Sequence, residues 1–161
     1  MWFAKHEAFD RQFRERFLAT HEVAARGALM HWLDDSEPAL ALVLLLDQFP
    51  RNAFRGTRRM YATDEFARHT AGIAIAAGHD RHVEEPMMKF FYLPFAHSES
   101  LAYQEHCVAL AERLGCYDHE RAQHHCDIIR RFGRFPHRNP ILGRPMRPEE
   151  QAYLDAGGYQ G

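Results

Sequence analysis

Apolar residues recur along the chain at helical spacing. Near the start, four of them are separated by four, four and one positions and so share one face of a helix: Phe9, Phe13, Phe17 and Leu18. No segment shows the strict alternation or the enrichment in β-branched residues that a sheet needs. The pattern therefore predicts an all-α protein of about seven helices, and the short connections favour antiparallel neighbours.

The helix expected over residues 37–48 is apolar on every side. Its body, ALALVLLL, leaves no polar face, so we expect this helix to lie in the middle of the fold. Ser36 can cap it, and Pro38 falls in its first turn, where a missing N–H costs nothing. The longest uninterrupted apolar run, residues 39–46, is too short to cross a bilayer.

Residues that start and stop helices divide the rest of the chain. Thr63 can cap a third helix, and Gly78 can end it. Further helices are expected over residues 86–92, 98–114, 119–132 and 148–156, and Gly133 and Gly157 can end the last two. A chain of 161 residues suits one domain. We predict a single helical domain over residues 1–156, followed by a flexible glycine-rich tail over residues 157–161.

Composition argues against several classes of function. The formal net charge is −2, so the overall field favours neither nucleic acid nor an anionic membrane. The first residues carry charges where a secretory signal needs apolar side chains, which indicates a cytoplasmic protein. The three cysteines form no CxxC pair and are predicted to be reduced, mostly buried thiols.

Arginine dominates the basic residues. It supplies 18 of 20, and seven lie between Arg121 and Arg147, where Asp127 is the only acid. A GC-rich genome also produces such an excess. Arginine is nevertheless the residue that makes fixed bidentate contacts to carboxylate or phosphate, so these positions are candidates for binding an anion.

Two similar turns follow helices in the sequence. One is Phe49-Pro50-Arg51-Asn52 with Gly56 four positions after the Asn, and the other is Phe135-Pro136-His137-Arg138-Asn139 with Gly143 at the same offset. Proline is expected to end each helix, Asn tolerates left-handed geometry and can bond its own backbone, and Gly allows a tight exit. The turns are either helix stops whose arginines cap carbonyl groups, or two corners that face one cleft and present guanidinium groups to an anion.

Asp47 lies at the carboxyl end of the most apolar helix. The helix dipole and the loss of hydration both disfavour a carboxylate there, so it needs a partner. Arg51 at i+4 and Arg55 beyond the turn can each supply it. A structural ion pair and a catalytic carboxylate both remain open.

Twelve histidines raise the question of a metal. One candidate set contains His97, Glu99, His125, Asp127 and His137, and another contains Cys116, His119, His125 and Cys126. Neither has the spacing of a known metal motif, and adjacent positions on a helix point about 100° apart. We therefore expect no metal. No glycine-rich phosphate loop or dinucleotide fingerprint is present either, so no cofactor is expected.

Three blocks of the chain resemble the signature blocks of domain of unknown function 924, a mainly bacterial family. They are LALVLLLDQFPRNAFRGT, FFYLPFAHSE and IIRRFGRFPHRNPILGR, and the resemblance runs from about Trp2 through RPEEQAYLDAGG. It implies an all-helical fold like that of tetratricopeptide-repeat proteins, with helix pairs in a right-handed stack. The N-terminus is shorter than the family pattern, and GRPMRPEE replaces a Ser-Thr-Pro-Glu-Glu-like turn. The resemblance implies no activity.

Three functions fit these residues. The first is a binding module for an anionic small molecule or an acidic peptide, with the following ligand-binding residues: Asp47, Gln48, Arg51, Asn52, Arg55, Arg134, Arg138 and Asn139. The alternative is a hydrolase of phosphate or carboxylate esters, in which His97 or His137 acts as acid or base and Glu99 orients it. The third is a scaffold whose polar residues are structural. Homo-oligomerisation stays open.

Overall fold

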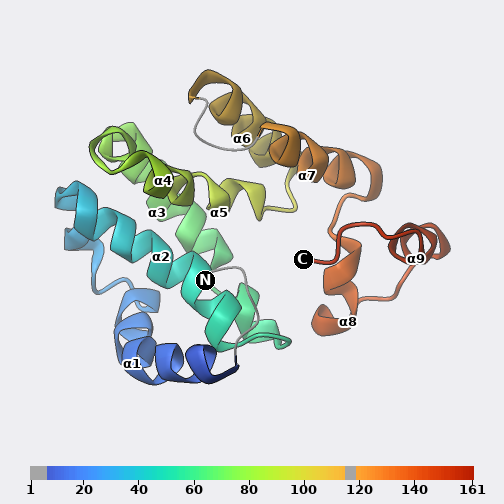
Figure 1. Cartoon of the computed structure of the whole chain (residues 1–161), viewed down its shortest axis with the longest axis horizontal. Coiled ribbons are helices and arrows are strands. Elements are labelled where there is room, and N and C mark those ends of the chain that lie inside the picture. Colours follow the sequence, from blue (N-terminus) through green and yellow to red (C-terminus); the bar gives the residue numbers. More distant parts are fainter. Residues whose placement is uncertain (1–6, 115–118) are drawn as a thin grey trace. The chain divides into compact units, whose positions relative to one another are not determined.

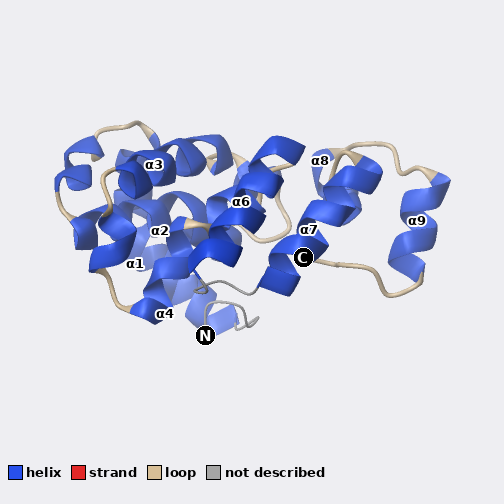
Figure 2. Cartoon of the chain, turned by 90° about the horizontal axis from the view of Figure 1, so that it is seen from above, coloured by secondary structure: helices blue, strands red, loops and turns tan. Residues whose placement is uncertain are grey.

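The computed structural model describes residues 7–114 and 119–161. In these ranges the chain forms α-helices and 3₁₀ turns and contains no strand, which confirms the all-α prediction (Figures 1 and 2). No helix of the described part is both long and apolar enough to span a bilayer. The contacts divide the chain into two compact units, unit 1 up to His97 and unit 2 from Ser98 onward. Each unit is described by itself, and the single-domain boundary stays a prediction.

Unit 1 is built around its second helix. It contains α1 (Glu7–Ala25), α2 (Ser36–Ala53), α3 (Asp64–Ala76), α4 (Glu85–Met88) and α5 (Leu93–Ala96), with 3₁₀ turns at Met30–Asp34, Arg58–Tyr61, His79–His82 and Lys89–Phe91. Helix α2 packs against both α1 and α3 (Figure 1). Its Leu42, Val43 and Leu46 are at most 1% exposed, so the prediction that this apolar helix lies in the middle is confirmed for unit 1.

Proline does not end α2. The prediction of a break at Pro50 is wrong, because the helix continues through this residue to Ala53. A proline inside a helix has no N–H for the carbonyl four residues earlier, which here belongs to Leu46. The hydroxyl of Thr63 donates to that carbonyl oxygen at 2.6 Å and replaces the missing bond.

The start of α3 also differs from the prediction, because the Thr63 side chain has another role. Thr63 stands at the N-cap position, as predicted, but its side chain makes no capping bond. Its hydroxyl serves α2 instead. The end of α3 agrees with the prediction, because Gly78 adopts left-handed geometry with φ of 80°.

Unit 2 contains a helical hairpin and two short helices. The elements are α6 (Leu101–Leu114), α7 (His119–Phe132), a 3₁₀ turn at Pro136–Arg138, α8 (Asn139–Leu142) and α9 (Pro148–Asp155). Helices α6 and α7 pack along each other. The core of the unit is formed by Ile128, Ile129, Phe132 and Phe135. Cys107 and Cys126 are buried thiols, as predicted, while Cys116 lies outside the described residues.

The glycine-rich end of the chain is anchored by one aromatic side chain. Tyr159 packs against the core of unit 2, and its backbone N–H donates to the hydroxyl of Tyr153 at 2.9 Å. Gly157 ends α9 with φ of 84°, as the sequence predicts. Residue 159 is therefore part of the packed unit.

The second proline turn has a different backbone from the first. Phe135 is extended, with φ of −85° and ψ of 111°, and Pro136 begins the next 3₁₀ turn. Neither asparagine uses the left-handed region that its side chain tolerates, because every residue with positive φ in the described part is a glycine. The glycine prediction is confirmed, since Gly56 and Gly143 have φ of 77° and 66°.

Candidate functional site

Asp47 is the centre of a buried polar cluster in unit 1. Its side chain is fully buried and accepts a hydrogen bond from the Gln48 amide at 2.6 Å. The Nδ1 of His97 lies 2.7 Å from one carboxylate oxygen, and Nη1 of Arg51 lies 3.2 Å from the same oxygen. The sequence predicted a partner for this carboxylate at Arg51. It did not predict the contact with His97, which is 50 positions away.

Arg51 joins α2 to the start of α3. It makes a bidentate pair with Asp64 at 2.8 and 2.9 Å and donates to the backbone oxygen of Asp47 at 2.7 Å. Burial opposes the charge of Arg51, but Asp47 and Asp64 outweigh it and raise its pKa. Asp64 was missed in the sequence, where it resembles any acidic residue in the first turn of a helix. Arg51 therefore acts as the counter-ion of two carboxylates.

The protonation states of Asp47 and His97 follow from their surroundings. Burial would raise the pKa of Asp47, but Arg51, His97 and the Gln48 amide lower it to about 2. Burial and the charge of Arg51 lower the pKa of His97, and the attraction of Asp47 only partly offsets them. At neutral pH Asp47 is ionised and His97 is neutral. A neutral His97 donates from Nδ1 to Asp47, so its Nε2 is the basic atom.

Two further hydrogen bonds connect Gln48 with Arg55, which follows the end of α2, through the Asn52 side chain. The Asn52 amide donates to the backbone oxygen of Gln48 at 3.2 Å, and Arg55 donates to the Asn52 side-chain oxygen at 3.0 Å. Asn52 is buried, whereas Arg55 is exposed. Asn52 therefore positions the guanidinium of Arg55 at the surface.

Arg55 is one of three exposed arginines in the segment after α2, and a fourth, Arg14 of α1, lies over the Phe54 ring of this segment. We define the Phe54 arginine cluster as Arg14 of α1 with Arg55, Arg58 and Arg59 of the segment after α2. The guanidinium carbons of Arg59 and Arg14 lie 3.9 and 5.5 Å from the centroid of the Phe54 ring. Glu22 forms an ion pair with Arg59. Of these four arginines, only Arg55 was among the residues predicted from the sequence to bind a ligand.

Glu99 is held within unit 2 by an arginine that the sequence analysis missed. Arg144 makes a bidentate pair with Glu99 at 2.6 and 2.9 Å, and the N–H of Phe135 donates to Glu99 at 2.8 Å. Burial opposes ionisation, but Arg144 and the Phe135 N–H lower the pKa of Glu99. The carboxylate that contacts His97 in unit 1 is that of Asp47, at 2.7 Å.

Glu150 organises a second buried cluster in unit 2. It is fully buried and makes a bidentate pair with Arg134 at 2.6 and 2.8 Å. It also accepts from the Asn139 amide at 3.0 Å and from the N–H of Arg147 at 2.9 Å. Arg134 and the Arg147 N–H lower the pKa of Glu150 to about 2 against the effect of burial. Two predicted ligand-binding residues, Arg134 and Asn139, thus support a carboxylate of the protein.

The remaining candidates lie in an aromatic cluster. The guanidinium carbon of Arg138, a buried residue, is 4.6 Å from the centroid of the Phe135 ring. His125 and His137 both pack against Tyr159, with ring centroids 4.6 and 5.1 Å apart. These contacts place His137 in a packed cluster.

Two residues of the candidate metal set, His125 and Asp127, have other surroundings in unit 2. Asp127 is exposed and pairs with Arg130 at 2.7 Å, whereas His125 is buried in the aromatic cluster. Among the described side chains, no three of the His, Cys, Asp and Glu type are grouped as a metal would need. The candidate set with Cys116 falls partly outside the described residues.

The structure therefore assembles the predicted residues in two groups. Asp47, Gln48, Arg51 and His97 meet in unit 1, with Asn52 and Arg55 beside them. Arg134 and Asn139 meet at Glu150 in unit 2. A single cleft shared by both proline turns stays a prediction.

The fold and these groups define an all-helical protein in which buried carboxylates organise arginine, histidine and asparagine side chains. The sequence matches the family described as bacterial protein of unknown function (DUF924) over residues 1–158, and the chain belongs to this family. A solved structure of a protein of unknown function from Agrobacterium tumefaciens is similar to it. The two chains are 53% identical, with a TM-score of 0.93 over 97% of this chain and 89% of the other. No curated protein matches the chain.

Proposed function

We propose that the protein is a cytoplasmic helical binding module that engages an anionic group through the Phe54 arginine cluster. The observation that carries the proposal is that two exposed guanidinium groups, those of Arg14 and Arg59, lie over the buried Phe54 ring, while Arg55 and Arg58 are exposed in the same segment as Arg59. Glu22 is a carboxylate partner of Arg59. Arg14 and Arg58 form no ion pair with any described side chain. A phosphate or carboxylate group would balance this positive charge, and guanidinium groups bind both.

Arg51 is less suited to this role than Arg55. Its neighbourhood contains two carboxylates, Asp47 and Asp64, against one guanidinium and a neutral His97, so its net charge is negative. An added anion would be repelled there. In the proposal, Asp47, Gln48 and Arg51 fix the end of α2, and Asn52 positions Arg55. The proposal does not require Arg134, Arg138 or Asn139.

A titration with two anionic probes tests this function. Pyrophosphate represents a small molecule and hexaglutamate an acidic peptide, and binding is followed by chemical shifts of unit 1. We expect Kd to rise with ionic strength, because exposed charges are screened. The double substitution Arg55→Gln with Arg58→Gln should raise Kd about tenfold, which corresponds to roughly 1.4 kcal/mol. The control Arg81→Gln removes an exposed arginine from the His79–His82 turn. Equal affinities for the double variant and the control would refute the proposal.

The Asp47–His97 contact favours a hydrolase as the second candidate. A neutral imidazole oriented by a buried carboxylate is suited to act as a general base. Its Nε2 would take a proton from water as the oxygen attacks the carbonyl or phosphorus atom of an ester. When the ester bond breaks, the same nitrogen would return the proton to the leaving alkoxide.

The hydrolase has its own test with p-nitrophenyl acetate and p-nitrophenyl phosphate. Because the pKa of His97 is lowered, we expect the rate to be flat around neutral pH and to fall in acid as His97 becomes protonated. His97→Asn should abolish that pH-dependent rate, while His69→Asn, at an exposed histidine of α3, should not. A rate no higher than that of buffer alone would leave only the binding module.

A further inference from the structure

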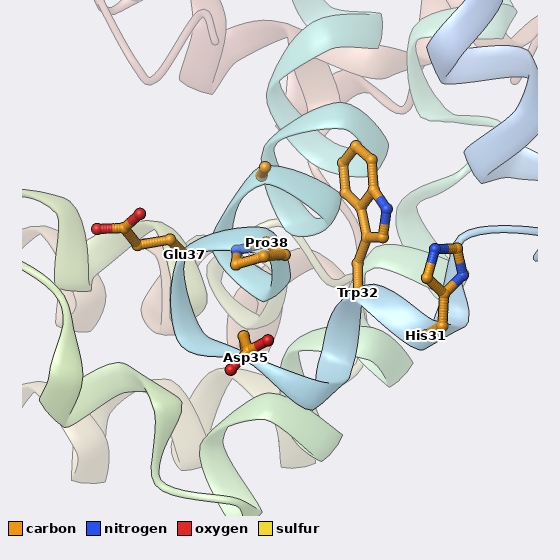
Figure 3. Close-up of a pocket in the computed structure, with 6 residues that line it drawn as sticks. His31, Trp32, Asp35, Glu37 and Pro38 are labelled. Carbon is orange, nitrogen blue, oxygen red and sulfur yellow. The ribbon is translucent and has the colours of Figure 1, made fainter.

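A surface hollow lies where the chain enters α2, at the opposite end of this helix from the Phe54 arginine cluster. Its volume is about 450 Å³, within the range of small-molecule sites. It is lined by His31, Trp32, Asp35, Glu37, Pro38 and Ala41. Figure 3 shows Trp32 and His31 on the segment before α2, and Asp35, Glu37 and Pro38 around the start of the helix.

Trp32 gives the hollow an aromatic wall that is held in place. Its side chain is half-buried and packs against the core cluster that contains Leu42, Leu45 and Leu46. Its remaining surface lines the hollow together with Pro38 and Ala41. The indole therefore presents a π surface whose orientation is fixed by the core.

The charge of the lining is negative. Asp35 stands at the N-cap position of α2, but its carboxylate makes no capping bond, so helix capping does not account for it. Glu37 lies in the first turn. Within the described part of the chain, neither acid forms an ion pair, and the lining contains no lysine or arginine. Figure 3 shows the two acids and the indole on different sides of Pro38, so the hollow has an acidic side and an aromatic side.

We propose that this hollow binds a small organic cation that carries ammonium groups on a short apolar chain. An ammonium group is attracted by the face of an indole, for which tryptophan is the best side chain, and by the two carboxylates. The apolar chain would contact Pro38 and Ala41. The positive ligand distinguishes this site from the Phe54 arginine cluster, which is suited to anions, so the two inferences are independent.

The test is an NMR titration with 1,4-diaminobutane, followed through the indole N–H of Trp32. The chain has two tryptophans, so Trp2→Phe assigns the signal. We expect a saturable shift that 1,4-butanediol, which is of similar size but uncharged, does not produce. Asp35→Asn with Glu37→Gln should raise Kd about tenfold or more. The matched control is Asp34→Asn, at a neighbouring exposed acid that does not line the hollow.

Three outcomes would overturn the proposal. The first is no saturable shift with the diamine. The second is an equal Kd for the double variant and for Asp34→Asn, which would mean that the lining carboxylates do not bind it. The third is the same shift with MgCl₂ at matched ionic strength, since a hydrated metal ion lacks the apolar chain. Trp32→Phe keeps an aromatic wall and should weaken binding less than the double variant, as a check that the fold of the hollow is intact.

Discussion

The two proline turns share a Phe-Pro pair but differ in what surrounds the proline. Pro50 is inside α2, and the carbonyl that it leaves without an N–H, at Leu46, receives the Thr63 hydroxyl. In unit 2, Gly133 has already ended α7 with φ of 70° before Pro136 begins the next turn. The comparison shows that Pro50 is accommodated inside a helix where another donor reaches the freed carbonyl, whereas α7 ends before its Phe-Pro pair begins.

The turns also differ in where their carboxylates come from. In unit 1, Asp47 lies on the same helix as Arg51, four residues earlier. In unit 2, Glu150 reaches Arg134 and Asn139 from α9. The same residue types are thus held by a local acid in one unit and by an acid from another element in the other.

The largest effect is expected at Asp47. Asp47→Asn leaves Arg51 with one carboxylate and His97 without its ionic partner, so we expect unfolding to become easier by roughly 3 kcal/mol. Chemical denaturation of unit 1 measures it. Asp127→Asn, at an exposed acid, serves as the control and should change the free energy of unfolding by less than about 0.5 kcal/mol.

The same carboxylate predicts a pH dependence. Its pKa is about 2 in the folded protein against 3.8 for the unperturbed group, so its contribution is present above about pH 4 and is lost as the pH falls toward 2. The loss should be roughly 2 kcal/mol. In Asp47→Asn, acid titration of unit 1 should lack this part of the loss; an unchanged profile would contradict the ion pair.

A smaller effect is expected at Glu150. In Glu150→Gln one acceptor oxygen becomes an NH₂ group that faces the donors of Arg134 or Asn139, which should cost roughly 2 kcal/mol. The loss should appear in unit 2 and leave the unfolding of unit 1 unchanged. If hydrogen exchange shows both units affected equally, the separation of the two clusters is wrong.

The next effect concerns Thr63. Thr63→Val removes the donor to Leu46 and should cost roughly 1–2 kcal/mol. In a Pro50→Ala background the alanine N–H can bond the same carbonyl, so the cost of Thr63→Val should largely disappear. A double-mutant cycle measures this coupling, and Pro136→Ala, which is remote from Thr63 in sequence and element, should show none.

The smallest effect should be the same in both turns. Gly56→Ala and Gly143→Ala each put a side chain on a left-handed residue, at roughly 1 kcal/mol apiece. At Gly56 an added Cβ would meet nothing within 4 Å, so backbone geometry alone sets the cost. Asparagine at this position should cost less than alanine, and thermal unfolding distinguishes the two.

Local sequence patterns predicted much of the helical structure. The apolar body of α2 identified a central helix, and Gly78, Gly133 and Gly157 marked helix ends, because helical period and glycine geometry depend on neighbouring residues. Pro50 was misjudged because the donor that rescues its helix comes from Thr63, 17 positions away from Leu46. No local pattern contains that contact.

The polar clusters were also predicted only in part, because some of their partners come from distant positions in the sequence. The need for a partner at Asp47 followed from burial, and Arg51 at i+4 was in reach along one helix. His97, Asp64 and Arg144 became partners only through tertiary packing. An acid in a first turn or an arginine after a glycine does not reveal which distant charge it meets.

The bond between Thr63 and Leu46 has a consequence for how this chain can change over generations. If the hydroxyl at position 63 is lost while Pro50 is retained, the Leu46 carbonyl has no hydrogen-bond donor. If Pro50 is replaced first, the new backbone N–H can bond this carbonyl, and the later loss of the Thr63 hydroxyl is tolerated. Substitution at these two sites should therefore have a preferred direction, with position 50 free to vary first and position 63 released only afterwards.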